Sequence, residues 1–514
     1  MTLQDPFPET DMPDGRIYVG GEFRVGTGEE ITSYFPADMR INRVMRGAGT
    51  ADAALALERA QAAAMAPAWR NLLPHQRASY LYEIAEALAR NADRIAWIQT
   101  RDTGKTLMET RALAQSAAAT FRYYAAVVET REEAITPARG PYMTLSCYEP
   151  VGVVCAITPW NSPIASDAQK VAPALAAGNA VVLKTATWTP LVALEFARII
   201  DATSLPKGLF SVLPGSGEIV GEYLVNHPMV RRISFTGGTR VGHAIALHAA
   251  KRMIPVSLEL GGKSPTIVFA DADQDVAIAG ILYGIFSSSG QSCVAGSRLF
   301  IHEDIYESFL ERLVRAAKGL KVGHPFAPQT QVGPLVHAAH LRTVEGWVEK
   351  ARKAGGDILA GGRRPEGSMY DAGIYYQPTV IAGLPNASEA CREEIFGPVL
   401  TVQKFSNIGE VIALANDNPY ALACGIWTRD NVQAMQVGRR ITTGTVWSIP
   451  ISSFPYPRLL AERRKVAWAG KKVFRDFFHT CGRNPIILAC LKSRILGPRH
   501  ENAGAFPLFE DGIS

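Results

Sequence analysis

Apolar and polar positions follow two different rhythms along the chain. In ADAALALERAQAAA and RASYLYEIAEALARNADRIAWI the apolar residues recur every three or four positions, as on one face of a helix. These stretches are rich in Ala and poor in helix breakers. The pattern therefore predicts helices over 51–70, 74–98 and about 108–130, after short strands and glycine turns over 16–50.

From residue 146 onward strands and helices alternate. CYEPVGVVCAI is an almost continuous apolar run, typical of a strand that is buried on both faces. The run is followed in turn by a helix (SDAQKVAPALAAG), a strand (NAVVLK), helix 190–202, strand GLFSVLP, helix 216–226 and strand RRISFTG. The same alternation resumes around 265–330 and 375–430. This order predicts an α/β protein with doubly wound parallel sheets.

Composition narrows the class of protein. The chain has 514 residues, 47% of them hydrophobic, which is enough for several domains and a large core. A net charge of +5 is too small to favour nucleic-acid binding, and no apolar run approaches the ~18 residues of a membrane span. The acidic, Pro-rich N-terminus does not resemble a signal peptide, and the seven scattered cysteines form neither a disulfide framework nor a metal motif. We therefore expect a cytoplasmic protein without a bound metal.

Cys293 is the first candidate for chemistry. It lies in Ser-Ser-Ser-Gly-Gln-Ser-Cys-Val-Ala-Gly, where small neighbours would let a substrate approach the thiol. Thiolate is the reactive form of cysteine. Taken alone, however, a free cysteine is more often a small buried hydrophobic residue.

Two polar residues are candidates to assist a nucleophile. Glu259 stands between two leucines before a Gly-Gly pair, and partial desolvation would raise its pKa toward that of a general base. The alternative is an ion pair with Lys263. Asn161, in Pro-Trp-Asn-Ser-Pro after a buried strand, could donate to an oxyanion, or could simply form a turn.

Three further segments follow predicted strands and resemble nucleotide-binding turns. Lys184 ends Val-Val-Leu-Lys, where an ammonium group can reach ribose or phosphate. The segments Phe235-Thr-Gly-Gly-Thr and Gly215-Ser-Gly could present backbone N–H groups to a pyrophosphate. None fits GxGxxG, so each segment alone is equally compatible with an ordinary glycine turn.

The motifs together resemble the aldehyde dehydrogenase superfamily. PWN, the strand-end Lys, FTGGT, LELGGKSP, GQSC and EEIFGPV occur in that family's order and spacing, over roughly residues 16–447. The resemblance implies a Rossmann-like cofactor-binding domain over 1–128 and 147–258 and a catalytic domain over 259–447. It also implies an oligomerisation hairpin over 129–146 and, for a chain with an intact tail, a homodimer or homotetramer.

The resemblance also assigns roles to individual residues. Cys293 would attack the aldehyde, Asn161 and the Cys293 backbone N–H would hold the oxyanion, and Glu259 would activate the hydrolytic water. Lys184 would bind the adenosine ribose, Glu394 the nicotinamide ribose, and Phe396 would pack beside the nicotinamide. The implied catalytic residues are Cys293, Glu259, Asn161 and Lys184. The implied NAD(P)-binding residues are Trp160, Lys184, Thr187, Gly217, Phe235, Gly237, Gly238, Glu394 and Phe396.

One departure from the family concerns the cofactor. The family often has Lys-Pro-Ser-Glu after the strand, with the Glu bound to the adenosine ribose hydroxyls, whereas this chain has Lys-Thr-Ala-Thr ending at Thr187. Thr187 carries no charge to repel a 2′-phosphate, so we expect NADP to be accepted as well as NAD. The substrate pocket is expected near 167–170, Ser292 and Val294, and its side chains do not specify an aldehyde.

The family pattern stops after Trp447. SIPISSFPYPRLLAERRKVAWAGKKVF replaces the expected Val-Asn and the later Gly-Gly-x-Lys-x-Ser-Gly-x-Gly-Arg-Glu. A one-base shift in reading frame makes the codons compatible with Val-Asn-Thr-Tyr and with Gly-Gly-Ala-Lys-Lys-Ser-Gly-Leu-Gly-Arg-Glu. We therefore predict that 448–514 is an aberrant, poorly folded tail in which Cys481 and Cys490 have no role. The hairpin edge would then stay unpaired.

Two functions follow from these features. The first is an NAD(P)-dependent aldehyde dehydrogenase that makes carboxylic acids. Because Glu259 is retained, hydrolysis of a thioester is favoured over its transfer to coenzyme A. The second is a catalytically impaired remnant of such an enzyme, produced by the shifted C-terminus.

Overall fold

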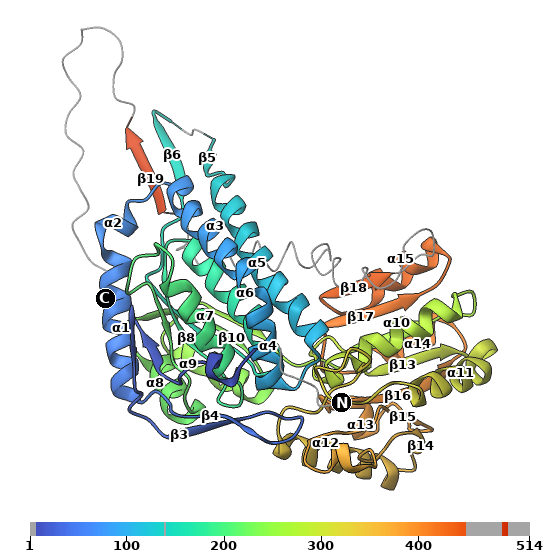
Figure 1. Cartoon of the computed structure of the whole chain (residues 1–514). Helices are drawn as coiled ribbons and strands as arrows, with labels where there is room; N and C mark the ends of the chain where they lie inside the picture. Colours follow the sequence, from blue (N-terminus) through green and yellow to red (C-terminus); the bar gives the residue numbers. More distant parts are fainter. Residues whose placement is uncertain (1–6, 138–139, 449–485, 492–514) are drawn as a thin grey trace, which may run out of the picture.

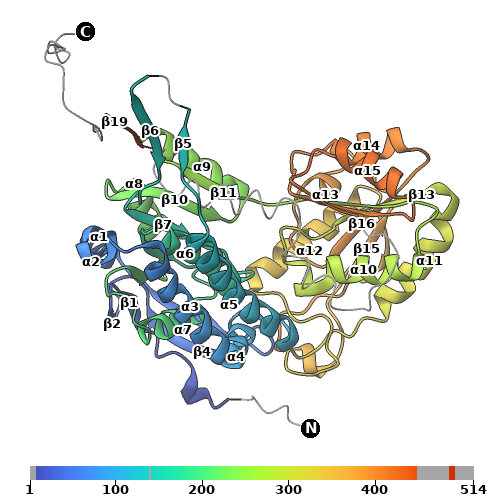
Figure 2. The ribbon, with the colours of Figure 1, turned by 90° about the horizontal axis from the view of Figure 1, so that it is seen from above.

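The chain folds into two α/β lobes, each built on one sheet. The computed structural model describes residues 7–137, 140–448 and 486–491. Figure 2 shows the two lobes side by side, the first containing β1 to β11 and the second containing the strands from β12 to β18. The sheets divide between Glu259, which ends β11, and Pro265, which begins β12.

The first sheet has the order β11-β10-β7-β8-β9-β1-β2. The strands from β11 to β9 are parallel, whereas β1 is antiparallel to both of its neighbours. All five residues of β7 and of β8 are buried, which explains their continuous apolar sequence. The strands are β1 (Ile17–Val19), β2 (Glu22–Arg24), β7 (Val153–Ile157), β8 (Ala180–Lys184), β9 (Phe210–Val212), β10 (Val230–Thr236) and β11 (Val256–Glu259).

Helices cover this sheet on both faces (Figure 1). The expected helix over 74–98 is two helices, because the side-chain Nδ2 of Asn91 donates to the Ala87 carbonyl (2.8 Å) and the chain breaks there. The helices of this lobe are α1 (Thr50–Met65), α2 (Pro67–Arg70), α3 (Pro74–Arg90), α4 (Ala92–Thr103), α5 (Leu107–Glu129), α6 (Pro163–Ala176), α7 (Leu191–Asp201), α8 (Glu222–Asn226) and α9 (Thr239–Lys251).

The second sheet has the order β14-β15-β16-β13-β12-β17-β18, and only β14 runs antiparallel to its neighbour. The strands are β12 (Pro265–Val268), β13 (Arg298–His302), β14 (Asp357–Ala360), β15 (Thr379–Ala382), β16 (Val399–Phe405), β17 (Ala423–Trp427) and β18 (Thr445–Ser448). The helices are α10 (Gln274–Phe286), α11 (Tyr306–Lys318), α12 (Ala338–Lys353), α13 (Glu389–Arg392), α14 (Ile408–Asn416) and α15 (Asn431–Arg440).

A hairpin projects from the first lobe. It consists of β5 (Ala134–Thr136) and β6 (Tyr142–Cys147), and β19 (Ile486–Leu491) pairs with β6 in antiparallel register. Figure 1 shows this three-stranded sheet beyond α3 and α5. The expectation that the edge of the hairpin stays unpaired was therefore wrong. The run Ile-Ile-Leu-Ala-Cys-Leu is apolar and begins with two β-branched residues, which favour a strand. This preference holds whether or not the reading frame is shifted. The rest of the tail after Ser448 lies outside the described residues.

A separate pair of strands, β3 (Glu30–Tyr34) and β4 (Ile41–Arg46), lies along the first lobe.

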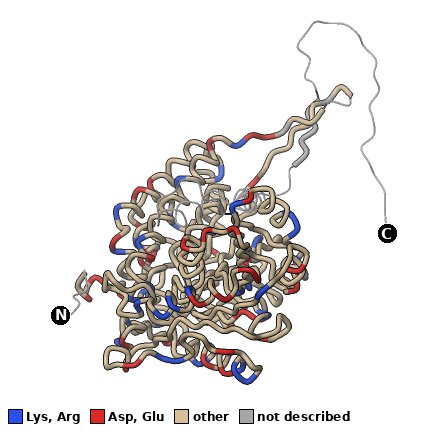
Figure 3. Tube along the Cα trace, turned by 90° about the vertical axis from the view of Figure 1, so that its right-hand side faces the viewer, with Lys and Arg blue, Asp and Glu red and all other residues tan. Residues whose placement is uncertain are grey.

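Acidic and basic residues are interspersed along the trace in Figure 3, without a concentrated basic face on the side shown. Within the described ranges, no helix is long and apolar enough to cross a bilayer.

Candidate functional site

Cys293 follows a strained segment at the end of α10. The 3-10 turn over Ser287–Gly290 contains two serines in the left-handed region, Ser288 with φ 55° and Ser289 with φ 54°. Such angles are costly for residues other than glycine. The Ser289 hydroxyl donates to the Gly333 carbonyl (2.7 Å), which helps to hold the turn. Cys293 itself is half-buried, so its thiol is not an inert core group.

Asn161 meets this segment from the other lobe. It follows β7, and its Nδ2 donates to the Gln291 carbonyl at 3.0 Å, two residues before Cys293. The Gln291 side chain in turn accepts from the Val336 N–H (2.9 Å). No role could be predicted for Gln291 from the GQSC motif, because Val336, the partner of its side chain, lies 45 residues along the chain. The structure therefore brings the predicted nucleophile and the predicted amide donor together.

Glu259 ends β11 and carries the features of a buried base. Burial raises the pKa of its carboxyl, and the nearby charge of Lys170 lowers it. Lys170 lies on α6, and its ammonium donates to the Ser234 hydroxyl of β10 (3.1 Å). The alternative partner, Lys263, interacts instead with groups of the second lobe, and burial lowers its pKa to about 8.

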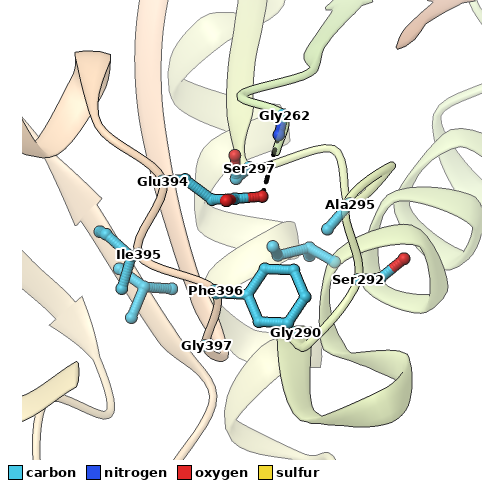
Figure 4. Close-up of a pocket in the computed structure, with 11 residues that line it drawn as sticks. Gly262, Gly290, Ser292, Ala295, Ser297, Glu394, Ile395, Phe396 and Gly397 are labelled. Atoms are coloured by element: carbon cyan, nitrogen blue, oxygen red, sulfur yellow. Dashed lines mark hydrogen bonds between the residues drawn. The ribbon is translucent and has the colours of Figure 1, made fainter. Parts of the chain in front are cut away.

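The Gly-Gly pair after Glu259 has a steric reason. A Cβ at Gly261 would lie 2.2 Å from Oε2 of Glu394, and a Cβ at Gly262 would lie 2.2 Å from the Cys293 carbonyl oxygen. The Gly262 N–H donates to Oε1 of Glu394 (2.9 Å), as Figure 4 shows. Burial raises the pKa of the Glu394 carboxyl. The motif thus places Glu259, Cys293 and Glu394 around the same short turn.

Figure 4 shows a small pocket beside this turn, with the Phe396 ring near its centre and Ser292 among the residues that line it. Phe396 has φ 58°, an unusual conformation for a residue with a side chain. Its carbonyl accepts from the Nε2 of His340 (2.8 Å), and burial lowers the pKa of that histidine. The Phe396 ring packs edge-on against Trp160, with centroids 5.2 Å apart.

Three more aromatic side chains join this cluster and were missed from the sequence. Trp160 contacts His340 (centroids 5.2 Å apart) and Trp188 (5.7 Å). Trp188 stacks on His337 at 4.6 Å with an interplanar angle of 4°. Trp188 lies in the turn after β8, whereas His337 is the N-cap of α12 and His340 lies in its first turn. The histidines are far from Trp188 and Trp160 in sequence, so the contact becomes visible only in the fold.

The remaining predicted residues lie along the carboxyl edge of the first sheet. Lys184 ends β8, is 7% exposed, and burial lowers its pKa to about 8. Its carbonyl accepts from the Thr158 N–H (3.2 Å), two residues before Trp160. Thr187 is half-buried in the turn before α7. This edge is where open α/β sheets bind ligands.

Two glycines on this edge have room beside them. Gly217 begins a π-helical turn over Gly217–Gly221, and Gly238 is the N-cap of α9, which has no side-chain cap. A Cβ at either residue would meet nothing within 4 Å. Gly237 packs instead on the buried Phe235, and its N–H donates to the Glu259 carbonyl (3.0 Å). An open, uncapped helix N-terminus on the same sheet edge as the buried Lys184 suits the pyrophosphate of a dinucleotide.

Comparison with known proteins agrees with this geometry. The model of the aldehyde dehydrogenase family matches residues 23–452. A (Z)-2-((N-methylformamido)methylene)-5-hydroxybutyrolactone dehydrogenase from Acinetobacter baylyi is 39% identical over 439 residues, covering 85% of this chain and 89% of the relative. A betaine aldehyde dehydrogenase from Mesorhizobium japonicum is 40% identical over 438 residues, covering 85% and 89%.

Solved structures give the same result. A putative aldehyde dehydrogenase from Burkholderia cenocepacia superposes with a TM-score of 0.83 at 35% identity, covering 86% of this chain and 90% of that one. The NAD+ complex of an aldehyde dehydrogenase from Bacillus cereus gives 0.83 at 33% identity, covering 86% and 89%. By sequence and fold, this chain belongs to the aldehyde dehydrogenase family.

Proposed function

We propose that this chain oxidises an aldehyde to a carboxylic acid with NAD(P)+, using Cys293 as the nucleophile. The observation that carries the proposal is the approach of Cys293 and Glu394 to the Gly261–Gly262 turn, which follows Glu259 in the chain. Asn161 joins this arrangement through its hydrogen bond to the Gln291 carbonyl, two residues before Cys293. The relatives are named for different substrates, so the proposal is made for an aldehyde group.

In the first half of the reaction the Cys293 thiolate bonds to the carbonyl carbon. The carbonyl oxygen becomes an oxyanion, which the Cys293 backbone N–H and the second N–H of the Asn161 amide would hold. The other N–H of Asn161 donates to the Gln291 carbonyl and fixes the amide in place. NAD(P)+, held by the residues named below, would supply the hydride acceptor for this carbon, and loss of the hydride would leave a thioester on Cys293.

In the second half Glu259 accepts a proton from water. The water oxygen attacks the thioester carbon, the carbon–sulfur bond breaks, and the acid and the Cys293 thiolate are released. The raised pKa of Glu259 makes it a stronger base than an exposed carboxylate. Retention of this base favours hydrolysis over transfer to coenzyme A.

For the cofactor, we assign the adenosine ribose to Lys184 and Thr187 and the pyrophosphate to the region of Gly217, Gly237 and Gly238 beside Phe235. The nicotinamide half would lie against Glu394, Phe396 and Trp160. Because Thr187 replaces the family's acidic residue, we propose that NADP binds as well as NAD.

The domain roles follow the two sheets. We assign the first lobe, 1–128 with 147–258, to cofactor binding, the second, 259–447, to catalysis, and the hairpin over 129–146 to oligomerisation. We propose a cytoplasmic protein that forms a homodimer or homotetramer when its C-terminal segment is intact. The family match ends at residue 452, close to Trp447, as a frameshift there would require.

Replacement of Cys293 by Ala tests the proposal. We expect no dehydrogenase turnover, while NAD(P)H still binds with unchanged affinity in a fluorescence titration. Turnover at the wild-type rate in Cys293→Ala would refute the nucleophile. A wild-type chain without a cooperative melt and without a thermal shift in NAD or NADP would favour the impaired remnant instead.

A further inference from the structure

Glu109 links α5 of the first lobe to the segment that precedes the nucleophile. It lies in the first turn of α5, and its Oε1 accepts from the Ser288 N–H at 2.5 Å, across 179 residues of chain. Its Oε2 accepts from the N–H (3.0 Å) and the hydroxyl (2.9 Å) of Thr106, the N-cap of the same helix. The two oxygens of one carboxylate therefore serve two separate elements.

The helix is well placed for this role. Figure 2 shows α5 running from the second lobe to the hairpin of the first. Its N-terminal end is anchored on the second lobe, where the Leu107 N–H donates to the Pro325 carbonyl (3.0 Å). Glu109 thus reaches the nucleophile segment from a fixed helix rather than from a loop.

Glu109 accepts its hydrogen bond from a residue with a strained backbone. Ser288 and Ser289 occupy the left-handed region, and backbone strain of this kind persists only where the surroundings enforce it. Ser288 also connects directly to the site, because its carbonyl accepts from the N–H and the side-chain Nε2 of Gln291. Gln291 in turn accepts from Asn161.

We propose that Glu109 is a positioning residue for Cys293, which holds the strained segment 287–291 so that the thiol and the Asn161 amide share one geometry. The proposal rests on the function proposed above. It assigns Glu109 no contact with the substrate or the cofactor.

Glu410 provides a matched control. It lies in the first turn of α14, and its Oε2 accepts from the N–H (2.8 Å) and hydroxyl (2.7 Å) of Ser406, as that of Glu109 does from Thr106. Ser406 precedes the N-cap Asn407, so Glu410→Ala removes a comparable carboxylate interaction at a helix N-terminus away from the site. Glu109→Gln keeps an amide oxygen that can accept from the Ser288 N–H.

The test compares these variants by hydrogen exchange and kinetics, using the full chain. In Glu109→Ala we expect amide exchange over 287–293 to accelerate about tenfold or more. We expect kcat to fall about 10- to 100-fold with unchanged NADH affinity. Glu410→Ala should lower the melting temperature but change neither quantity, and Glu109→Gln should recover most of kcat.

Unchanged exchange over 287–293 in Glu109→Ala, or a kcat equal to that of Glu410→Ala, would overturn the positioning role. Hydrogen exchange needs no turnover. A failure of the proposed dehydrogenase function, seen as no turnover of an aldehyde by the wild-type chain, is therefore distinguishable from a failure of this inference.

Discussion

The pKa of Glu259 depends on its burial and on the charge of Lys170. Burial raises the pKa of Glu259, and the charge of Lys170 opposes that rise. Lys170→Met removes the opposing charge, so the pKa of Glu259 should rise further. A base acts only when unprotonated, so activity disappears as the pH falls through this pKa. We therefore expect the acid limb of the kcat profile to move to higher pH in Lys170→Met.

Lys207→Met is the control, because Lys207 is exposed and pairs with Asp201 on the surface. Its acid limb should match that of the wild type. If the acid limb stays in place or moves to lower pH in Lys170→Met, the charge of Lys170 does not lower the pKa of Glu259.

Thr187 is the residue at which cofactor choice can be tested. Thr187→Glu introduces a negative charge beside the proposed ribose site, which would repel a 2′-phosphate but not a 2′-hydroxyl. We expect the ratio of kcat/KM for NADP to that for NAD to fall by about tenfold or more, equivalent to about 1.4 kcal/mol. A wild-type enzyme that already rejects NADP as strongly as Thr187→Glu would show that another residue decides the preference.

At the scale of elements, the nucleophile turn packs directly against the turn that carries Phe396. Gly290 has φ 71°, and a Cβ there would lie 2.0 Å from the Gly397 carbonyl oxygen. Gly290→Ala should therefore lose stability from two sources, about 1–2 kcal/mol of backbone strain and about 1–3 kcal/mol of overpacking. It should also reduce kcat, because both turns line the site.

Gly355 is the matched control for strain alone. It has φ 88°, and a Cβ there would meet nothing within 4 Å. In denaturant unfolding, the free energy of unfolding of Gly290→Ala should be lower than that of Gly355→Ala by about 1 kcal/mol or more. Equal losses in the two variants would mean that the turns around Gly290 and Gly397 separate easily.

At the scale of the whole molecule, the reading frame of the C-terminal segment after Trp447 can be tested by DNA sequencing. We expect the source DNA, sequenced across codons 440–514, to contain one further G at Trp447. The restored frame would supply the family's C-terminal segment and, with it, the terminal strand of an intersubunit sheet. If the G is absent, the printed chain is the gene product. The pairing of β19 with β6 then becomes the relevant arrangement of the hairpin.

Much of this architecture could be predicted from local pattern. The buried strands β7 and β8 and the helices from α5 to α7 follow from apolar periodicity, and the family and α/β fold implied by the motifs are confirmed. The break at Asn91 could not be predicted, since helical periodicity continues through it. The strand β19 was not predicted, because the segment after Trp447 lacks the family's sequence pattern and was therefore expected to be poorly folded.

The sequence by itself determined the family, the succession of strands and helices, and the residue types available for chemistry. These depend on periodicity and on motifs whose members are neighbours in the chain. Only the tertiary structure decided that Asn161 bonds to Gln291, that the charge of Lys170 rather than that of Lys263 acts on Glu259, and that Glu109 holds Ser288. Each of these contacts joins separate elements, so its geometry exists only once the two sheets and their helices are packed.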